Sequence, residues 1–288
     1  MKVFSPDTFA EALAVKAAHP DAVPIAGGTD VMVELNFDRR RPPALLNLNR
    51  IAPLHEHSDV DGRVRIGAGM PYTRIIAELG DRLPGLAMAA RTVGSPQIRN
   101  RGSVGGNLGA ASPAGDSHPA LLAAEADVEI ASARGVRMVP AKDFYTGVKR
   151  NVLEPDELIA AVHVQPATGP QQFSKVGTRN AMVIAVCAFS VALHADRNRV
   201  GTGIGSAAPT PRRAYEAEEF ADAELPWGSA ESLAPALGRR FGQLVAQAAA
   251  PIDDVRGSAA YRTHALSVMA RRALGWAWDD YRRSSQCA

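Results

Sequence analysis

The sequence predicts an α+β fold with a large N-terminal body and a smaller C-terminal domain. Through residues 1–167, short apolar runs that end in turns alternate with stretches of helical spacing. After the segment PATGPQ this alternation gives way to strand-like runs separated by turns. The last third of the chain, residues 214–281, shows Ala-rich helical patterns. A domain boundary is therefore expected near Pro166–Pro170.

The N-terminal body begins with helices and strands in alternation. SPDTFAEALAVKAAHP predicts a helix, because Ser5 or Asp7 can cap its first free amides and Pro20 follows its end. DAVPIAGG predicts a short strand that enters a glycine turn, and TDVMVELNF predicts a helix capped by Thr29 or Asp30. ALLNLN and GRVRIGAG predict two further strands, whereas PYTRIIAELG and RLPGLAMAARTVG predict helices.

A segment rich in Gly, Ser and Pro follows at residues 95–119, SPQIRNRGSVGGNLGAASPAGDSHP, and it predicts a loop. A structureless loop of this length is unusual inside a compact domain, which favours a functional role. Beyond it, ALLAAEADVEIASARGVRMVPAKDF predicts a helix and two strands that turn near Arg134 and Gly135. ELIAAVHVQP predicts another strand.

The C-terminal domain is predicted to contain strands first and helices afterwards. FSKVGTRNAMVIAVCAFSVALHADRNRVGTGIG alternates apolar runs with turns, one of them at Asp196–Asn198. The helices that follow are expected to break at Pro226, Pro235 and Pro251. His163 and His194 lie at the ends of apolar runs, where a structural role is expected for both.

Composition argues against several functional classes. The 288 residues carry a formal net charge of only +2 and no long basic cluster, so nucleic-acid binding is not expected. Cys187 and Cys287 form no CxxC or Cys/His cluster, so this chain is expected to hold no metal. No apolar run reaches the ~20 residues of a membrane span. The start MKVFSPDTFAEAL lacks the apolar core of a signal peptide, so a cytoplasmic location is expected.

The first candidate binding loop is Gly27-Gly28-Thr29-Asp30, between a predicted strand and a predicted helix. Its backbone amides can point at an anion, and the helix start behind them favours negative charge. A glycine pair in this position also occurs as a simple turn. The loop is not GxGxxG, no acidic residue follows at the ~20-residue offset, and no GK[ST] is present. A ligand here would use neither of these common nucleotide folds.

The second candidate binding loop is RNRGSVGGNLG, Arg99–Gly109. Four glycines free its backbone, while Ser103 and Asn107 add short polar side chains. A surface loop with two hairpins is the alternative, but so many glycines are costly to order without a ligand. Two such loops in one domain could embrace a diphosphate from both sides, which suits a dinucleotide. Asp116, a few residues on, could accept a hydrogen bond from a ribose or a ring N–H.

Four motifs in this order resemble a known family. AGGTD, GSPQIRNRGSVGGNLGAASPAGD, VLEPDELI and FSKVGTRNAMVIAVCAFSVAL are similar to the FAD-binding medium subunits of the xanthine dehydrogenase group of molybdenum hydroxylases. Carbon monoxide dehydrogenase, nicotinate dehydrogenase and hydroxybenzoyl-CoA reductase have similar subunits. The resemblance extends to PIDDVRGSAAYRTHALSVMARRAL and so covers essentially the whole chain. The ordered set is more specific than any single glycine loop.

The resemblance implies a definite domain organisation. Residues 1–167 would form a vanillyl-alcohol-oxidase-type (PCMH) FAD-binding domain of two α/β subdomains, at about 1–57 and 58–167. Residues 171–288 would form a small antiparallel sheet with a helical bundle. Both expectations agree with the order of elements predicted from the residues themselves.

The resemblance also implies the residues that bind FAD. The first loop would wrap the pyrophosphate with Ile25, Ala26, Gly27, Gly28, Thr29, Asp30 and Val31. The second would close on the same diphosphate, through backbone amides and the Ser103 hydroxyl, with Ser103, Val104, Gly105, Gly106 and Asn107.

Three further residues would contact the flavin end. Asp116 would form a hydrogen bond there, Leu153 would pack on the ring system, and Lys175 would lie beside the pyrimidine end. A cation at that place stabilises the anionic reduced flavin. Without the motif context, Leu153 would be interpreted as an ordinary core leucine and Lys175 as a solvated strand lysine.

The function implied by the resemblance is electron transfer. FAD in this chain would take electrons from 2Fe-2S clusters of a small partner subunit and pass them to NAD+ or another acceptor. Hydroxylation would occur on a large subunit that carries the molybdenum cofactor. Flavin accepts single electrons and gives a hydride, so it suits a junction between clusters and a nicotinamide. No catalytic residue is therefore expected in this chain.

Two differences between family members bear on the substrate. Hydroxybenzoyl-CoA reductase-type subunits hold an extra four-iron cluster on cysteines that this chain lacks. Carbon monoxide dehydrogenase subunits usually read Gly-Gly-His-Ser at the first loop, whereas Gly28-Thr29-Asp30 is more usual in purine and other heteroaromatic hydroxylases. A xanthine dehydrogenase-like enzyme is favoured, and carbon monoxide dehydrogenase-like or nicotinate dehydrogenase-like subunits stay open as alternatives.

Two other classes of function remain as rivals. A stand-alone flavoprotein oxidase would need a substrate pocket with its own base, and the helical C-terminal third leaves little room for one. A nucleotide-binding protein with a regulatory or assembly role would use the glycine loops without any redox chemistry. Such a protein would be colourless when purified.

Overall fold

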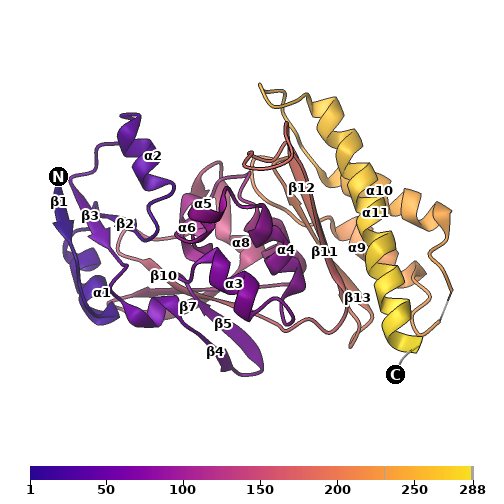
Figure 1. Cartoon of the computed structure of the whole chain (residues 1–288), viewed down its shortest axis with the longest axis horizontal. Helices are drawn as coiled ribbons and strands as arrows, with labels where there is room; N and C mark the ends of the chain where they lie inside the picture. Colours follow the sequence, from indigo (N-terminus) through magenta and orange to yellow (C-terminus); the bar gives the residue numbers. More distant parts are fainter. Residues whose placement is uncertain (230, 287–288) are drawn as a thin grey trace.

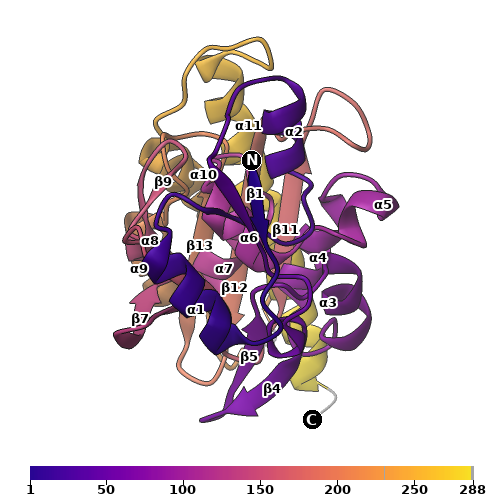
Figure 2. The ribbon, with the colours of Figure 1, turned by 90° about the vertical axis from the view of Figure 1, so that its left-hand side faces the viewer.

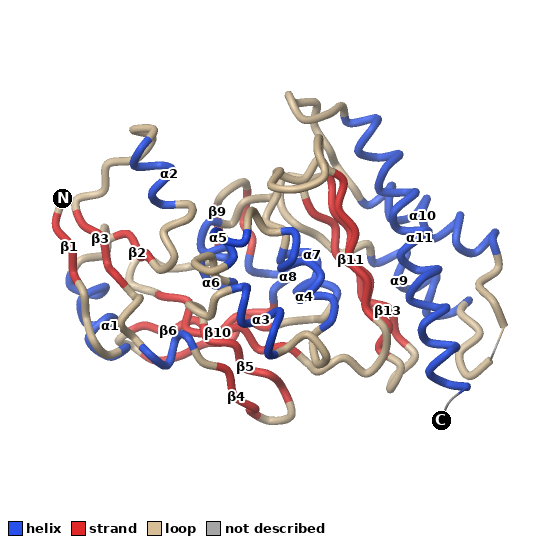
Figure 3. The backbone as a smooth tube through the Cα atoms, viewed as in Figure 1, coloured by secondary structure: helices blue, strands red, loops and turns tan. Residues whose placement is uncertain are grey.

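The sheets of the protein follow one another along its long axis (Figures 1 and 3). The computed structural model describes residues 1–229 and 231–286, so Cys287 lies outside the described residues. A three-stranded sheet comes first, a five-stranded sheet forms the centre, and a second three-stranded sheet lies beneath the C-terminal helices. This arrangement confirms the predicted α+β class. No helix within these ranges combines the length and the apolar character needed to cross a bilayer.

The N-terminal sheet is parallel, with strand order β1-β3-β2. The elements of this region are β1 (Lys2–Phe4), α1 (Phe9–Ala18), β2 (Val23–Ile25), α2 (Val31–Asn36), β3 (Ala44–Asn47) and η1 (Ala52–His55). Figure 2 looks onto this end, with α1 and α2 in front and the C-terminal helices behind. Because the strands are parallel, β2 delivers the chain into the first glycine loop at the carboxyl edge of the sheet.

The predicted cap of α1 was wrong. Thr8, rather than Ser5 or Asp7, occupies the N-cap position, and its hydroxyl accepts a hydrogen bond from the Glu11 amide. The Glu11 carboxylate accepts in return from the amides of Asp7 and Thr8. This reciprocal capping box satisfies more free amides than either predicted cap alone, which explains the later start of the helix.

The central sheet is antiparallel, with strand order β4-β5-β10-β6-β7. Its buried face carries alternating aliphatic side chains such as Ile66, Ile130 and Val162, against which the helices of this region pack. The elements are β4 (His57–Val60), β5 (Arg63–Gly67), α3 (Tyr72–Glu78), α4 (Pro84–Thr92), α5 (Pro96–Arg99), α6 (Val104–Ala110), α7 (Ser117–Ala123), β6 (Asp127–Ser132), β7 (Gly135–Pro140), α8 (Ala141–Phe144), β8 (Tyr145–Gly147), β9 (Arg150–Asn151) and β10 (Leu158–Val164).

The segment 95–119, predicted as a loop, instead contains α5, α6 and the start of α7. Ser95 and Ser103 cap the two short helices by accepting from the amides of Ile98 and Gly106. Gly105 lies against the Ala68 backbone, where a Cβ atom would approach Ala68 O to 2.6 Å. Tertiary packing of this glycine thus outweighs its poor intrinsic helix propensity.

The C-terminal region is an antiparallel sheet, β11-β12-β13, covered on one face by α9, α10 and α11 and on the other by α4 and α7 (Figure 3). Its elements are β11 (Gln171–Val176), β12 (Cys187–His194), β13 (Arg199–Gly205), α9 (Tyr215–Glu224), α10 (Pro235–Ala248) and α11 (Ala259–Gln286). The predicted breaks at Pro226 and Pro251 are confirmed, whereas Pro235 is the first residue of α10.

Two histidines have structural hydrogen-bond partners, and one cysteine is buried. His163 lies 2.6 Å from a Glu129 carboxylate oxygen through Nε2, and His194 Nε2 lies 3.1 Å from the Ala123 carbonyl. The Cys187 thiol is buried in β12, and burial raises its pKa to about 12. A thiol with that pKa stays protonated and unreactive at neutral pH. These contacts agree with the structural roles predicted for the histidines.

Backbone packs directly on backbone where the central region meets the C-terminal sheet. A Cβ atom at Gly203 in β13 would lie 2.0 Å from the Pro119 carbonyl oxygen in α7. One at Gly201 would lie 2.1 Å from the Ala123 carbonyl oxygen. The absence of side chains at these two positions therefore fixes how closely α7 sits on the sheet.

We expect Gly203→Ala to lower the free energy of unfolding by about 2 kcal/mol or more, because the added methyl group forces α7 away from β13. Urea unfolding of the purified chain measures the change. Gly275→Ala is the matched control, since Gly275 lies within α11 with no atom in the way of a Cβ. This control should be neutral or stabilising by about 1 kcal/mol. Equal stability of the two variants would contradict the packing argument.

Candidate cofactor site

The two glycine loops lie against each other, although Asp30 at the end of the first and Arg99 at the start of the second are 69 positions apart in the chain. Gly27 packs so closely on the second loop that a Cβ atom there would lie 1.8 Å from the Arg101 carbonyl oxygen. Asn49 joins the same junction: its side-chain amide donates to the Ala26 carbonyl at 2.8 Å and accepts from Arg101 at 3.1 Å. The fold therefore brings both sequence-predicted loops to one place.

The first loop leaves a run of backbone donors unpaired. Among the described residues, none accepts a hydrogen bond from the backbone N–H groups of Gly27, Gly28, Thr29 or Asp30. Gly28 has φ +76°, a left-handed conformation that lets consecutive amides converge. Asp30 is the N-cap residue of α2, but its side chain makes no capping hydrogen bond. Folded proteins pair nearly all such groups unless water or a ligand reaches them, so the loop fits an anion.

The flanking residues of the first loop are only half-buried or exposed. Ile25 ends β2, and its carbonyl accepts from the Leu48 amide, which fixes the start of the loop. Val31 is the first residue of α2 and is half-buried. Neither side chain belongs to a buried cluster, so the loop contributes mainly backbone at this place.

The second loop is anchored within the protein and exposes one short stretch. The amide of Gly105 donates to the Ala68 carbonyl, and that of Gly106 donates to the Ser103 hydroxyl oxygen. Because that hydroxyl accepts through its oxygen, its own proton stays available for a ligand. Val104 is fully buried in the central core, whereas Gly106 is exposed and its Cβ position has only Ser103 Oγ nearby, at 3.2 Å. A ligand can therefore approach at Gly106.

A buried ion pair links the central region to the C-terminal sheet. Lys175 Nζ in β11 donates to Asp116 Oδ2 at 2.6 Å and to the Thr92 carbonyl at 3.2 Å. The Thr92 hydroxyl lies 3.1 Å from the same carboxylate oxygen. Both charged side chains are more than nine-tenths buried, so Lys175 is not a solvated strand lysine. Burial raises the pKa of Asp116, and the Lys175 ammonium opposes that rise.

The pair is incomplete on one side. Asp116 Oδ1 is buried and accepts no hydrogen bond within the described residues. An unpaired buried carboxylate oxygen is costly, typically about 1–3 kcal/mol or more for a charged group. The atom is therefore suited to accept from an N–H or O–H of a bound molecule.

Leu153 lies in the turn between β9 and β10, half-buried against the central cluster of apolar side chains. Asn151 holds this turn: its side-chain oxygen accepts from the Leu153 amide, and its nitrogen donates to the Gly109 carbonyl. The turn is thereby tied to the end of α6. Leu153 thus lies near the second loop but is not fully enclosed by protein.

His118 and Tyr145 occupy the interior behind these residues. His118 is fully buried, its Nδ1 lies 2.8 Å from the Tyr145 hydroxyl, and burial lowers its pKa to about 3. Burial raises the pKa of Tyr145 well above its usual value. Both groups are neutral at pH 7, which makes a structural role the simplest interpretation.

Sequence reasoning missed Asn49 and Thr92. Asn49 follows the carboxyl end of a parallel strand, where ligand-binding polar residues often occur, so the pattern NLNR held a usable signal. Thr92 is an ordinary residue near the end of a helix and carries no such signal. Its role depends on contacts with residues 24 and 83 positions away in the chain.

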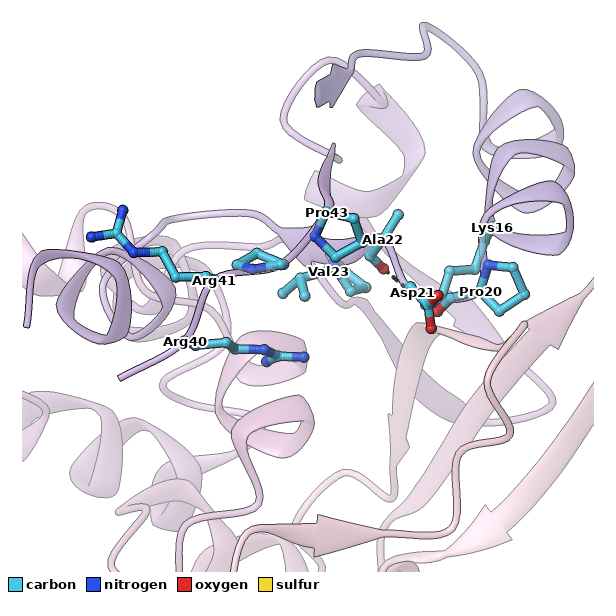
Figure 4. A pocket seen from close by; sticks show the side chains of 10 residues that line it. Lys16, Pro20, Asp21, Ala22, Val23, Arg40, Arg41 and Pro43 are labelled. Carbon is cyan, nitrogen blue, oxygen red and sulfur yellow. Dashed lines mark hydrogen bonds between the residues drawn. The ribbon is translucent and has the colours of Figure 1, made fainter. Parts of the chain in front are cut away.

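A separate surface hollow of about 390 Å³ lies at the amino ends of β2 and β3, away from the glycine loops (Figure 4). Lys16 and Arg40 line it, but the Lys16 ammonium already donates to the Pro20 and Ala22 carbonyls. Burial lowers the pKa of Lys16. In the described residues, no group of three or more His, Cys, Asp or Glu side chains could hold a metal ion.

Comparison with known proteins identifies the family of this chain. The model of the FAD binding domain in molybdopterin dehydrogenase matches residues 1–167. The model of the carbon monoxide dehydrogenase flavoprotein C-terminal domain matches residues 172–277. The carbon monoxide dehydrogenase structure from Hydrogenophaga pseudoflava includes a chain similar to this one, with a TM-score of 0.89, 27% identity and 98% of each chain covered.

Curated relatives cover nearly the whole chain as well. The xanthine dehydrogenase FAD-binding subunit of Escherichia coli O157:H7 is 32% identical over 278 residues, which are 93% of this chain and 92% of that protein. The carbon monoxide dehydrogenase medium chain of Hydrogenophaga pseudoflava is 31% identical over 273 residues and 90% of each chain. The chain therefore belongs to the FAD-binding medium subunits of the xanthine dehydrogenase and carbon monoxide dehydrogenase family, as an oxidoreductase component.

Proposed function

We propose that the two joined loops hold the FAD diphosphate. The observation that carries this proposal is the run of four unpaired amides at Gly27–Asp30, placed against the second loop by the Gly27–Arg101 contact. The remaining proposed contacts come from Ile25, Ala26, Val31, Ser103, Gly106 and Asn107. Val104 and Gly105, which the sequence also predicted as contacts, are buried, and the Gly105 amide already donates to the Ala68 carbonyl, so their proposed role is to anchor the second loop. In this arrangement the first loop supplies backbone N–H groups, and the second supplies the Ser103 hydroxyl proton and an open surface at Gly106.

The flavin end is proposed to lie at the Asp116–Lys175 pair. Asp116 Oδ1, which lacks a partner, would accept from a ring N–H or a ribitol hydroxyl. Lys175 would place a buried cation beside the pyrimidine end, and Leu153 would offer an apolar contact to the ring system. When bound, FAD supplies the ability to accept single electrons and to give a hydride. This chain then needs only to bind and orient the cofactor and to fix the charge around it.

The electron donor and acceptor are proposed from the family. A small 2Fe-2S subunit would deliver electrons from a large molybdenum-cofactor subunit, and NAD+ or another acceptor would receive them. Xanthine or another N-heteroaromatic compound is the favoured substrate of the complex, supported by the Gly28-Thr29-Asp30 loop and the xanthine dehydrogenase relative. Nicotinate dehydrogenase and carbon monoxide dehydrogenase subunits are similar too, so both alternatives stay open. The boundaries 1–167 and 171–288 and the cytoplasmic location remain predictions.

The decisive experiment is the flavin, iron and molybdenum content of the complex that copurifies with this chain from its native host. We expect about one FAD per chain together with iron and molybdenum on other subunits. Flavin without either metal would instead support a stand-alone flavoprotein oxidase. A colourless chain would contradict the cofactor site altogether.

We expect Gly28→Val and Gly106→Val to abolish FAD retention. Valine is strained at the φ of +76° of Gly28 and would distort the first loop, whereas at Gly106 its side chain would fill the open space beside Ser103. Flavin content after gel filtration measures the effect. Gly62→Val matches the backbone strain at Gly28, with φ +75° against +76°, but lies in the β4–β5 turn. Gly275→Val is the control for Gly106→Val, because Gly275 is also a glycine within a helix with open space around its Cβ position. FAD at full occupancy in both loop variants would remove the loops from the site.

We expect Lys175→Met to retain FAD and to lower its reduction potential by about 30–60 mV, because the negative charge of the reduced cofactor loses a buried cation. A redox titration of the purified complex measures the shift. Lys149→Met is the control, since Lys149 pairs with Glu34 at the surface. An unchanged potential in Lys175→Met would show that the cation does not face the flavin.

The same Lys175→Met variant should show a stronger pH dependence of stability than wild type in its FAD-free form. Without Lys175, only the hydrogen bond from the Thr92 hydroxyl opposes the effect of burial on Asp116, so the pKa of Asp116 rises further. A raised folded-state pKa gives stability that is complete at low pH and is lost as the pH rises through it. The variant should therefore lose more unfolding free energy than wild type as the pH rises above the usual pKa of an aspartate. Adding Asp116→Asn should remove this dependence, and its persistence would assign it to another group.

A further inference from the structure

A chain of three buried polar side chains ends at the second loop. The Tyr72 hydroxyl, at the start of α3, lies 3.1 Å from Ser117 Oγ at the start of α7. Ser117 Oγ lies 2.7 Å from Asn107 Oδ1 in α6. Tyr72 and Ser117 are fully buried, whereas Asn107 is half-exposed. Residues of α3 and α7 therefore determine how the amide side chain of Asn107 in α6 is oriented.

The direction of this chain follows from counting donors and acceptors. Within the described part of the molecule, the Tyr72 hydroxyl proton has no acceptor other than Ser117 Oγ. The phenol must therefore donate to Ser117, and the Ser117 proton must go on to Asn107. The reverse order would leave the phenol proton buried and unpaired, at a cost of about 1–3 kcal/mol. An acceptor is thus required at the Asn107 end, which is the amide oxygen and not the nitrogen.

The nitrogen of the same amide consequently faces the other way. Asn107 Oδ1 lies close to Gly115. A Cβ atom at position 115 would approach Asn107 Oδ1 to 2.7 Å, so a residue larger than glycine there would displace the amide oxygen. Asn107 Nδ2 donates to no described residue, and it is not among the side-chain atoms that are both buried and unpaired. The nitrogen therefore reaches the surface beside the exposed Gly106.

We propose, on the basis of the FAD site proposed above, that Tyr72 and Ser117 are positioning residues for cofactor binding. Their hydrogen bonds lock the Asn107 oxygen inward, so that the Asn107 nitrogen donates to a diphosphate oxygen of FAD. Neither Tyr72 nor Ser117 touches the cofactor in this arrangement. Their contribution is to prevent the amide from turning its oxygen toward an anion, which would repel it.

The first test replaces Asn107 Nδ2, which faces outward, and keeps an oxygen at the position of Asn107 Oδ1, which faces inward. Asn107→Asp keeps an oxygen for the Ser117 hydroxyl and turns the outward donor into an anionic acceptor. FAD is titrated into the full complex after flavin removal, and quenching of flavin fluorescence reports binding. We expect the dissociation constant to rise about 100-fold, and the loss to shrink at high salt as the repulsion is screened. Asn198→Asp, in the β12–β13 turn, adds the same charge elsewhere and should have no effect.

The second test separates positioning from a general structural role. Ser117→Ala should weaken FAD binding about 10-fold in wild type, but should add nothing in an Asn107→Ala background, where no amide remains to be oriented. Tyr72→Phe should weaken FAD binding less than Ser117→Ala does, because Ser117 can still donate to Asn107 but is no longer forced to do so by the Tyr72 proton. Ser132→Ala removes another buried hydroxyl, in β6, and should leave FAD affinity unchanged.

The possible outcomes are distinct. If the wild-type complex does not bind FAD, the proposed function itself fails. If wild type binds FAD but Asn107→Asp binds equally well, the amide nitrogen does not face the diphosphate and the inference is wrong. Additive losses from Ser117→Ala and Asn107→Ala would likewise overturn the positioning role, because a purely structural effect persists without the amide.

Discussion

The contact between the Gly27 backbone and the Arg101 carbonyl is the constraint on which the proposed cofactor site depends. It holds a loop at the carboxyl edge of the N-terminal sheet against a loop that caps α6. Any side chain at Gly27 would separate them, because its Cβ position is already occupied by the Arg101 carbonyl. Next to this contact the first loop turns through a left-handed conformation at Gly28, and the amides of Gly27–Asp30 find no partner within the described residues. An anionic ligand would accept hydrogen bonds from these unpaired amides.

The other end of the proposed site joins two regions of the molecule. Asp116 and Thr92 belong to the central region, whereas Lys175 comes from the first strand of the C-terminal sheet. Backbone contact of Gly201 and Gly203 with α7 keeps that sheet close enough for the ion pair to form. The C-terminal sheet therefore does more than cover the central region, because it contributes the buried cation. Electrostatics at the flavin end would then depend on the packing between the two regions.

Signals within a few residues of one another predicted the helices and strands that depend on such short-range signals. The elements and side-chain positions that the sequence did not predict depend on contacts between residues far apart in the chain. The strand into Gly27-Gly28 and the helix at Phe9–Ala18 were predictable from periodicity and turn residues. The cap at Thr8 was missed because Ser5, Asp7 and Thr8 are all good caps, and only the capping box with Glu11 decides between them. The helix at Val104–Ala110 was missed because its glycines are favoured by packing on Ala68. Burial of Lys175 could not be derived from its own strand, and the family resemblance implied only that Lys175 lies beside the pyrimidine end of the flavin.

The measurement that bears most directly on the site is amide hydrogen exchange in the segment from Val23 to Asn36, with and without FAD. Free amides at Gly27–Asp30 should exchange rapidly in the flavin-free complex, because none of them is hydrogen-bonded to a described residue. FAD should slow their exchange strongly, whereas riboflavin, which lacks the diphosphate, should not. Equal exchange of this segment in all three states would contradict a diphosphate bound by the first loop.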